Sequence, residues 1–340
     1  MLPELETWEG YRRTVLRQGA GLVPGHADIH PSVRKLAPEL FERVKRECPH
    51  VVVTTGEGDP RSAKPYAETD EWGITWQYPG DYLAGQAVTH PLDSWEKFRA
   101  YRVPDIETYQ DWKKVEAQVA EDRRKGLVAW GGIAHNFIYL KMTHLRGFEN
   151  FMLDAAEERC ELFELADRLA EFYVKVARRL CDMGANALST GDDLGHQNTM
   201  PISPALWRRL LKPAFAKVFR VCRDAGVLVY LHTDGWIVPI IPDLIEVGVD
   251  ILNPQDLVNG LDNLASLAKG KVGIDLDVDR QNITAFGAPA EVDAHVRACV
   301  EKLGSPSGGL ILKYYGWPGT PPDNAAQVVL SMERYHALWM

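Results

Sequence analysis

The chain has 340 residues, of which 46% are hydrophobic and 25% charged, and its formal net charge is -9. An acidic surface does not attract nucleic acid or an anionic membrane, so we expect neither as the main partner. The length and the apolar content are sufficient for one large buried core, and no linker divides the sequence. These features predict a single domain over residues 1–340.

The N-terminus and the cysteines bear on the cellular compartment. The start MLPELETWEG lacks the basic and apolar regions of a secretory signal, and no stretch reaches the roughly 20 apolar residues of a membrane span. The five cysteines are odd in number and widely spaced, without a CxxC pair, which is typical of reduced thiols. We therefore expect a cytoplasmic protein.

From Gly21 onward, apolar runs typical of buried parallel strands alternate with amphipathic helical segments. The predicted strands are LVPGHADIH from Leu22, LVAWGG from Leu127, ANALSTGDD from Ala185, LVYLHTDG from Leu228, VDILNPQ from Val249, KVGIDLDVD from Lys271 and GLILKYYG from Gly309. No strand is followed by a glycine-rich dinucleotide turn. The repeat therefore favours an α/β fold of the (β/α)₈ TIM barrel type over an open doubly wound sheet.

One segment, residues 51–91, interrupts this repeat. It has turn signals and alternating apolar residues but no helical period, which predicts a hairpin-rich insertion in the N-terminal part of the barrel. Aromatic side chains are dense in it. They either pack the hairpins onto the barrel or form a lid over a pocket, and in the second case Trp76 would contact the substrate.

Polar side chains gather where two of the predicted strands end. The run VLVYL stops at His232 and Asp234, and the preceding strand candidate stops at Asp192 and Asp193. Barrel enzymes place their chemistry at the carboxyl ends of the strands. We therefore expect these four side chains at one end of the barrel, within one pocket.

Several longer stretches carry a family signature. GDDLGHQNTMPISPALWRRLLKPAFAKVFRVCRDAG is followed by LHTDG and IPDLIEVGVDILNPQ, and the late stretch GGLILKYYGWPGTPPDN ends in a helix start. Together these stretches resemble the uroporphyrinogen decarboxylase superfamily. DEWGITWQYPG and HPLDSWEKFRAYRVPD are similar to the N-terminal part of its less characterised members. The fold that this resemblance implies is a (β/α)₈ barrel, in agreement with the strand pattern.

Departures from the superfamily's motifs separate its two chemistries. True decarboxylases bind a tetrapyrrole with eight carboxylates through an arginine-rich first strand, and LVPGHADIH has no arginine. The corrinoid-linked methyltransferases hold zinc with His-x-Cys and a later cysteine. Here Asp234 takes the place of the first cysteine, and the last strand offers Lys313 and Tyr315 instead of the second. The resemblance thus implies a site nearer the methyltransferase-like branch, but with hard ligands.

The candidate site residues follow from these positions. The catalytic candidates are His232, Asp234, Asp193 and Lys313. The candidate substrate contacts are Asp192, His196, Gln197, Trp236, Asp275, Tyr315, Trp317 and Trp76. A divalent metal such as Zn, Fe or Mn would be held by His232, Asp234, His26 and Asp28. In the alternative, the same polar groups bind the substrate directly, without a metal.

The function that we expect is methyl transfer between a small organic substrate or a folate-type carrier and a corrinoid co-substrate. Demethylation of a methoxylated or methylamine compound would fit, with the histidine and carboxylates polarising the leaving heteroatom. A corrinoid carrier protein and a second copy of the chain are the expected partners. Two alternatives remain: decarboxylation of a carboxylated substrate other than uroporphyrinogen, and corrinoid or tetrapyrrole binding without chemistry.

Overall fold

The computed structural model describes residues 4–19, 21–54 and 60–340, and its main feature is a curled sheet of eight parallel strands. The strands lie in the order β2-β1-β11-β10-β9-β8-β7-β6. Their bounds are β1 Gly25–Ile29, β2 Val51–Thr54, β6 Trp130–His135, β7 Ala187–Gly191, β8 Leu228–Thr233, β9 Ile251–Pro254, β10 Gly273–Asp277 and β11 Leu310–Gly316.

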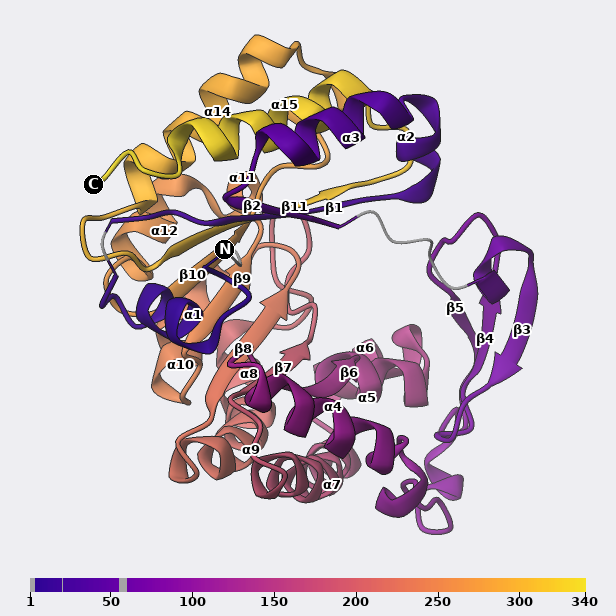
Figure 1. The fold of residues 1–340 in the computed structure, drawn as a ribbon. Coiled ribbons are helices and arrows are strands. Elements are labelled where there is room, and N and C mark those ends of the chain that lie inside the picture. The colour runs from indigo at the N-terminus through magenta and orange to yellow at the C-terminus, as the bar shows by residue number, and fades with distance from the viewer. Residues whose placement is uncertain (1–3, 20, 55–59) are drawn as a thin grey trace.

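Helices cover the outer face of this sheet and alternate with its strands along the chain (Figure 1). They are α1 Trp8–Val15, α2 Pro31–Leu36, α3 Pro38–Glu47, α4 Trp112–Arg124, α5 Tyr139–Arg146, α6 Phe148–Glu157, α7 Cys160–Asp182, α8 Pro204–Leu210, α9 Lys212–Asp224, α10 Ile241–Glu246, α11 Asp256–Asn259, α12 Leu261–Leu267, α13 Ile283–Phe286, α14 Pro289–Leu303 and α15 Pro322–Tyr335. Short 3₁₀ turns lie at η1 Pro60–Ala63, η2 Trp95–Lys97, η3 Ile106–Thr108 and η4 Val238–Ile240.

All seven strands expected from the sequence are present, and they form one parallel sheet, as the βα repeat requires. The sheet curls as in a TIM-like barrel. In the described part of the chain, however, its edge strands β2 and β6 have no backbone pairing with each other. The observed architecture is thus an α/β fold with an eight-stranded parallel sheet that is left open along one seam.

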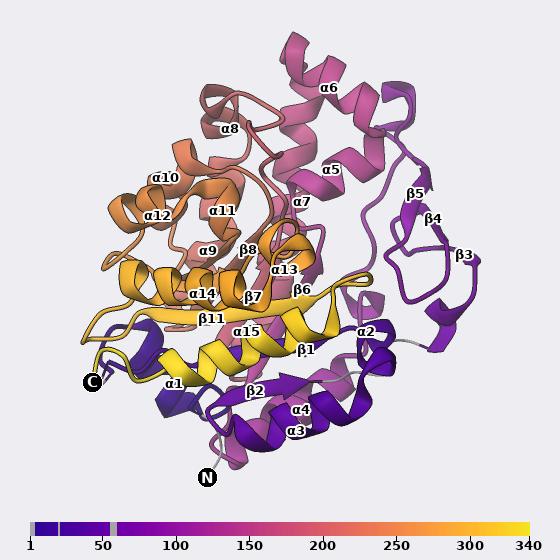
Figure 2. The same ribbon diagram turned by 90° about the horizontal axis from the view of Figure 1, so that it is seen from above.

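The hairpin-rich insertion forms a separate three-stranded antiparallel sheet that stands to one side of the molecule (Figures 1 and 2). Its strands are β3 Tyr66–Thr69, β4 Thr75–Tyr78 and β5 Gln86–Thr89. The structure differs from the expectation at the start of the insertion. Val51–Thr54 is β2, paired in parallel with β1, because its apolar β-branched run is buried between β1 and α15. Residues 55–59 of the expected insertion lie outside the described residues.

Helix α1 lies beneath the amino ends of the strands. Its Tyr11 and Val15 pack with Tyr230, Ile251 and Ile311, which come from three different strands, in a small cluster separate from the main core. The main core lies between the sheet and the outer helices. Since α1 occupies the amino ends, the carboxyl ends of the strands are the side on which a site can open to solvent. No helix among the described residues is long and apolar enough to span a membrane.

Candidate active site at the carboxyl ends of the strands

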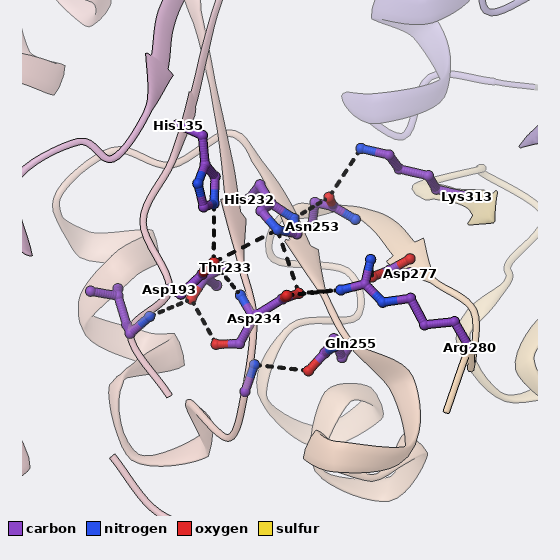
Figure 3. Close-up of polar contacts among 12 residues, drawn as sticks. His135, Asp193, His232, Thr233, Asp234, Asn253, Gln255, Asp277, Arg280 and Lys313 are labelled. Carbon is purple, nitrogen blue, oxygen red and sulfur yellow. Dashed lines mark hydrogen bonds and ion pairs between the residues drawn. The ribbon is translucent and has the colours of Figure 1, made fainter. Parts of the chain in front are cut away.

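Four polar side chains meet where β6, β7 and β8 end (Figure 3). His135 is the last residue of β6, Asp193 follows β7, and His232 and Asp234 lie at the end of β8. His135 Nε2 lies 3.1 Å from Asp193 Oδ1, and His232 Nε2 lies 3.8 Å from the same oxygen. The backbone N–H of Asp234 also donates to this oxygen, at 3.2 Å. Asp193 is therefore the centre of the group.

The hydrogen bonds of Asn253 fix which ring nitrogen of His232 carries the proton. Asn253 Nδ2 donates to the backbone oxygen of Asp275, so its Oδ1 is the acceptor. This Oδ1 accepts a hydrogen bond from Lys313 Nζ at 3.3 Å. It also lies 2.7 Å from His232 Nδ1, which must therefore be the protonated nitrogen. Nε2 of the neutral ring then carries a lone pair. This lone pair lies among the carboxylates of Asp193 and Asp234.

The charges around the two histidines differ. Burial lowers the pKa of His232, and Lys313 acts in the same direction, against the carboxylates of Asp234 and Asp193. Burial also acts to lower the pKa of His135, but its hydrogen bond with Asp193 and the charge of that carboxylate outweigh burial and raise it. His135 in turn holds the pKa of Asp193 below its usual value, although burial opposes this. The lone pair of His232 Nε2 thus faces the ionised carboxylate of Asp193, with no proton between the two groups.

Arg280 holds Asp234 in place. Its Nη2 donates to both carboxylate oxygens of Asp234, at 2.7 and 2.8 Å, and its Nη1 lies 3.3 Å from Asp277 Oδ2. Burial raises the pKa of Asp277 to about 7, although the Arg280 guanidinium acts in the opposite direction. Hydrogen bonds between two charged groups are roughly twice as strong as neutral ones. Asp234 is therefore held by a cation, whereas Asp193, which contacts both histidines, has no lysine or arginine nitrogen within 4.0 Å among the described residues.

Three groups of side chains in the described residues have ligand atoms close enough to share a metal ion, and one of them is His135, Asp193 and His232. The metal ligands expected from the sequence were His232, Asp234, His26 and Asp28, and of these only His232 belongs to such a group. His26 and Asp28 lie on β1, opposite Lys313 and Tyr315 of β11. Asp234 is paired with Arg280. The group thus shares one residue, His232, with the expected ligand set.

A cavity of about 670 Å³ opens beside Asp193 and His135, between the three-stranded sheet and the carboxyl ends of the strands. Its lining includes Trp76, whose Nε1 donates to Asp70 at 2.9 Å. Lys141 and His144 of α5 also line it. Burial lowers the pKa of Lys141 to about 8, and burial together with the Lys141 charge lowers that of His144 to about 4. The aromatic insertion therefore does form a wall of a cavity at the site.

Asp192 does not face this cavity, in contrast to its expected role as a substrate contact. It is fully buried, and its carboxylate accepts hydrogen bonds from the backbone N–H groups of Ile138, Tyr139 and Leu140, at 3.0, 2.6 and 2.8 Å. Burial raises its pKa to about 7, against the effect of these three bonds. Asp192 therefore satisfies the first turn of α5, where amide donors have no partner within the helix.

The remaining expected substrate contacts differ in their surroundings. His196 and Gln197 are exposed in the loop after β7, and Trp236 is half-buried against the core. Tyr315 and Trp317 form an edge-to-face pair, and the guanidinium of Arg280 lies over the Trp317 ring. These two rings are thus connected to the site through Arg280.

Lys313 and Asp275 lie deeper, inside the curled sheet. Lys313 Nζ donates to the hydroxyl of Tyr230, which donates to Asp275 Oδ2 at 2.8 Å. Lys313 supports His232 through Asn253, as described above. Lys313 and Asp275 therefore belong to a series of hydrogen-bonded polar side chains that leads away from the 670 Å³ cavity and into the interior of the sheet.

Sequence reasoning missed His135 and Asn253. His135 follows the short run WGGIA, in which two glycines weaken the strand pattern, and Asn253 lies in the run VDILNPQ, whose apolar residues indicate only a buried strand. The signal that was available is position: each stands at or near the carboxyl end of a predicted strand, as His232 does.

The fold and the site together define an α/β protein of the TIM-barrel type with a polar centre at the carboxyl ends of its strands. The sequence profile described as uroporphyrinogen decarboxylase (URO-D) matches residues 79–335. The chain belongs to this family. No protein with a curated description matches the sequence significantly.

Solved structures provide a second comparison. A methyltransferase from Methanosarcina mazei is similar over 98% of this chain and 100% of its own, with a TM-score of 0.68 and 15% sequence identity. A D-psicose 3-epimerase from Clostridium cellulolyticum covers 68% of this chain and 86% of its own, with a TM-score of 0.39 and 12% identity. A B12-independent methionine synthase from a Shewanella species covers 80% and 74%, with a TM-score of 0.37 and 10% identity. At 15% identity, the likeness to the Methanosarcina mazei methyltransferase shows the fold alone.

Proposed function

We propose that the protein transfers a methyl group from a methylated heteroatom of a small organic substrate to a corrinoid, with the help of a divalent metal ion at His135, Asp193 and His232. The observation that carries this proposal is the neutral Nε2 of His232, which lies 3.8 Å from Asp193 Oδ1 and 3.4 Å from Asp234 Oδ1, beside a 670 Å³ cavity. Family membership and the fold shared with a methyltransferase support an enzyme of this general kind.

The donor set fits a divalent metal. Two imidazole nitrogens and one carboxylate oxygen suit Zn, Fe or Mn, and such sites keep open positions for a substrate. Metal-binding histidines donate their other ring N–H to a neighbouring acceptor, and His232 does so to Asn253. The metal would act as a Lewis acid on the heteroatom that loses its methyl group. An oxygen or nitrogen atom suits this hard site better than a thiol does.

The chain's own residues would orient the substrate. Trp76 and the other aromatic side chains of the insertion give the cavity an apolar wall, which binds and positions a small organic molecule. Arg280 fixes the carboxylate of Asp234 by donating to both of its oxygens. Lys313 and Asn253 hold His232 in one orientation. The site is therefore arranged before a substrate binds, as efficient transfer requires.

The charge of the cavity argues against a substrate that is rich in carboxylates. Its lining includes the carboxylates of Glu68, Asp70, Glu71 and Asp193, but among the described residues Lys141 is its only lysine or arginine. Several substrate carboxylates without cationic partners would be costly to bury. This supports methyl transfer over decarboxylation of a polycarboxylate.

The proposal is tested by the cobalt spectrum. Wild-type protein, mixed with a Co(I) corrinoid that is free or on its carrier protein and with a panel of methoxylated and N-methylated compounds, should shift the absorption to that of the methylated corrinoid. Uroporphyrinogen should release no carbon dioxide. If every methyl donor leaves the spectrum unchanged while a carboxylated compound releases carbon dioxide, decarboxylation replaces methyl transfer as the function.

Trp76→Ala should raise KM for the methyl donor by roughly tenfold or more, because an aromatic side chain in contact with an apolar ligand contributes about 1.5–3 kcal/mol. kcat should change less, since Trp76 lies outside the group formed by His135, Asp193 and His232. Trp76→Phe is the matched variant: it keeps the apolar wall and removes the bond to Asp70. An unchanged KM in Trp76→Ala would place the substrate elsewhere.

A further inference from the structure

A second cavity of about 410 Å³ lies in the amino half of the sheet, away from the candidate active site. It is bordered by Val52 of β2 and Trp130 of β6. These are the two edge strands of the sheet, and in the described residues they do not pair with each other. Leu5 and Glu6 lie at its rim. Its inner wall is formed by side chains that point into the curled sheet: Tyr11, His26, Ser189, Tyr230, Asp275, Ile311 and Lys313. The open seam of the barrel thus has a polar pocket behind it.

This pocket contains one cation, Lys313, and one anion, Asp275, that make no direct ion pair. Lys313 Nζ contacts only neutral oxygens, the Tyr230 hydroxyl at 3.1 Å and Asn253 Oδ1 at 3.3 Å, and has no carboxylate oxygen within 4.0 Å in the described residues. Asp275 is 8% exposed and accepts from Tyr230 at Oδ2, but its Oδ1 has no partner there. The Tyr230 hydroxyl thus lies between Lys313 and Asp275, which make no direct ion pair, and Asp275 Oδ1 is left without a partner in the described residues.

Tyr11 adds an unused donor to the same pocket. Its side chain is 5% exposed, and its hydroxyl has no hydrogen-bond partner within the described part of the chain. Burial, with the nearby Asp275, raises the pKa of Tyr11 well above its usual value, so the hydroxyl keeps its proton. The ring lies edge to face with Trp130, at 5.3 Å, and Trp130 lies likewise against Tyr230, at 5.8 Å. Three aromatic rings therefore stand beside the unpaired groups.

We propose that this seam pocket binds a small zwitterion of the amino-acid class, such as a free or N-methylated amino acid. The ligand's carboxylate would pair with Lys313 and accept from the Tyr11 hydroxyl, and its ammonium group would pair with Asp275 Oδ1. Its side chain would lie against the rings of Tyr11, Trp130 and Tyr230. A volume of about 410 Å³ is within the range of small-molecule sites.

The competing explanation is that ordered water alone fills the pocket and satisfies the unpaired atoms. The two explanations differ in charge. Water can complete hydrogen bonds at Tyr11 and Asp275, but it carries no charge that could pair directly with Lys313 or Asp275. A zwitterion supplies both charges, and removal of either of its charged groups should therefore abolish most of its binding.

Calorimetric titration of the wild-type protein with a panel of amino acids and N-methylated amino acids tests the proposal. Each compound is compared with its amide, which lacks the carboxylate, and with its deaminated acid, which lacks the ammonium group. We expect at least one zwitterion to bind, and its two analogues to bind at least about tenfold more weakly. Lys313→Met and Asp275→Asn should each weaken the zwitterion by a similar factor.

Tyr11→Phe provides an independent test of the proposal if Lys313→Met and Asp275→Asn fail to fold. It removes a hydroxyl that has no internal partner, so thermal stability should not fall, while affinity for the zwitterion should drop about tenfold. Binding is the readout, so the outcome does not depend on whether methyl transfer occurs. The proposal is overturned if no zwitterion binds at millimolar concentration, if the analogues bind equally well, or if Tyr11→Phe binds like the wild type.

Discussion

His232→Ala should remove both the bound metal and the methyl transfer activity. Purified wild-type protein, prepared without chelator, is expected to contain about one divalent ion per chain, because His135, Asp193 and His232 form an open three-ligand site. Without the His232 imidazole only two ligands remain, and activity should fall at least about 100-fold. Inductively coupled plasma analysis of both proteins, together with the cobalt spectrum, measures the two effects.

Two further variants test how far metal binding depends on the residues around His232. Asn253→Ala removes the acceptor of His232 Nδ1, and loss of such a supporting contact costs roughly 10–100-fold in metal affinity. Asp28→Asn is the matched control, since Asp28 is a carboxylate near the end of a strand that lies outside the three-ligand group, and it should keep its metal. A wild-type protein that is active with no metal bound would show that the polar groups act on the substrate directly.

Most of the fold could be predicted from the sequence because the signal repeats. Each buried strand has a run of apolar residues that ends in polar ones, and seven such runs fix the α/β architecture even where single boundaries are off. The eighth strand, Val51–Thr54, has only four residues and is followed by turn signals, so it was absorbed into the insertion. Its identity depends on pairing with Gly25–Ile29, which is a tertiary contact.

The open seam between β2 and β6 was not predictable from the repeat. A count of seven or eight strands indicates a barrel, but closure depends on whether the last pair of strands meets with matching register. Trp130 begins β6, is 37% exposed and lies beside the second cavity, whereas a closed barrel would have paired the backbone of this strand. The seam is therefore a property of the assembled sheet.

The candidate site was only partly predictable, for a related reason. Position at the end of a strand correctly grouped His232, Asp234 and Asp193, because parallel strands end on the same side of the sheet. Which carboxylate stays open depends on partners distant in sequence. Arg280 pairs with Asp234, and backbone N–H groups at the start of α5 donate to Asp192. Two adjacent aspartates, Asp192 and Asp193, thus have opposite surroundings, which no local pattern could have separated.

Asp192→Ala should destabilise the protein by at least about 3 kcal/mol, because it leaves three buried backbone N–H groups, at residues 138–140, without an acceptor, and each such group costs about 1–3 kcal/mol. The free energy of unfolding, obtained from urea denaturation, measures this loss. Asp192→Asn is the matched variant. It keeps one side-chain acceptor oxygen, so it should lose less stability than the alanine variant.

The same substitution distinguishes a structural role from a substrate contact. Helix α5 carries Lys141 and His144 into the wall of the 670 Å³ cavity, and Asp192 holds the first turn of that helix. In Asp192→Ala, KM for the methyl donor should therefore rise together with the loss of stability, and Asp192→Asn should show a smaller change in both. If Asp192→Ala kept the stability of the wild type but no longer bound the substrate, Asp192 would be the substrate contact that its position at the strand end first suggested.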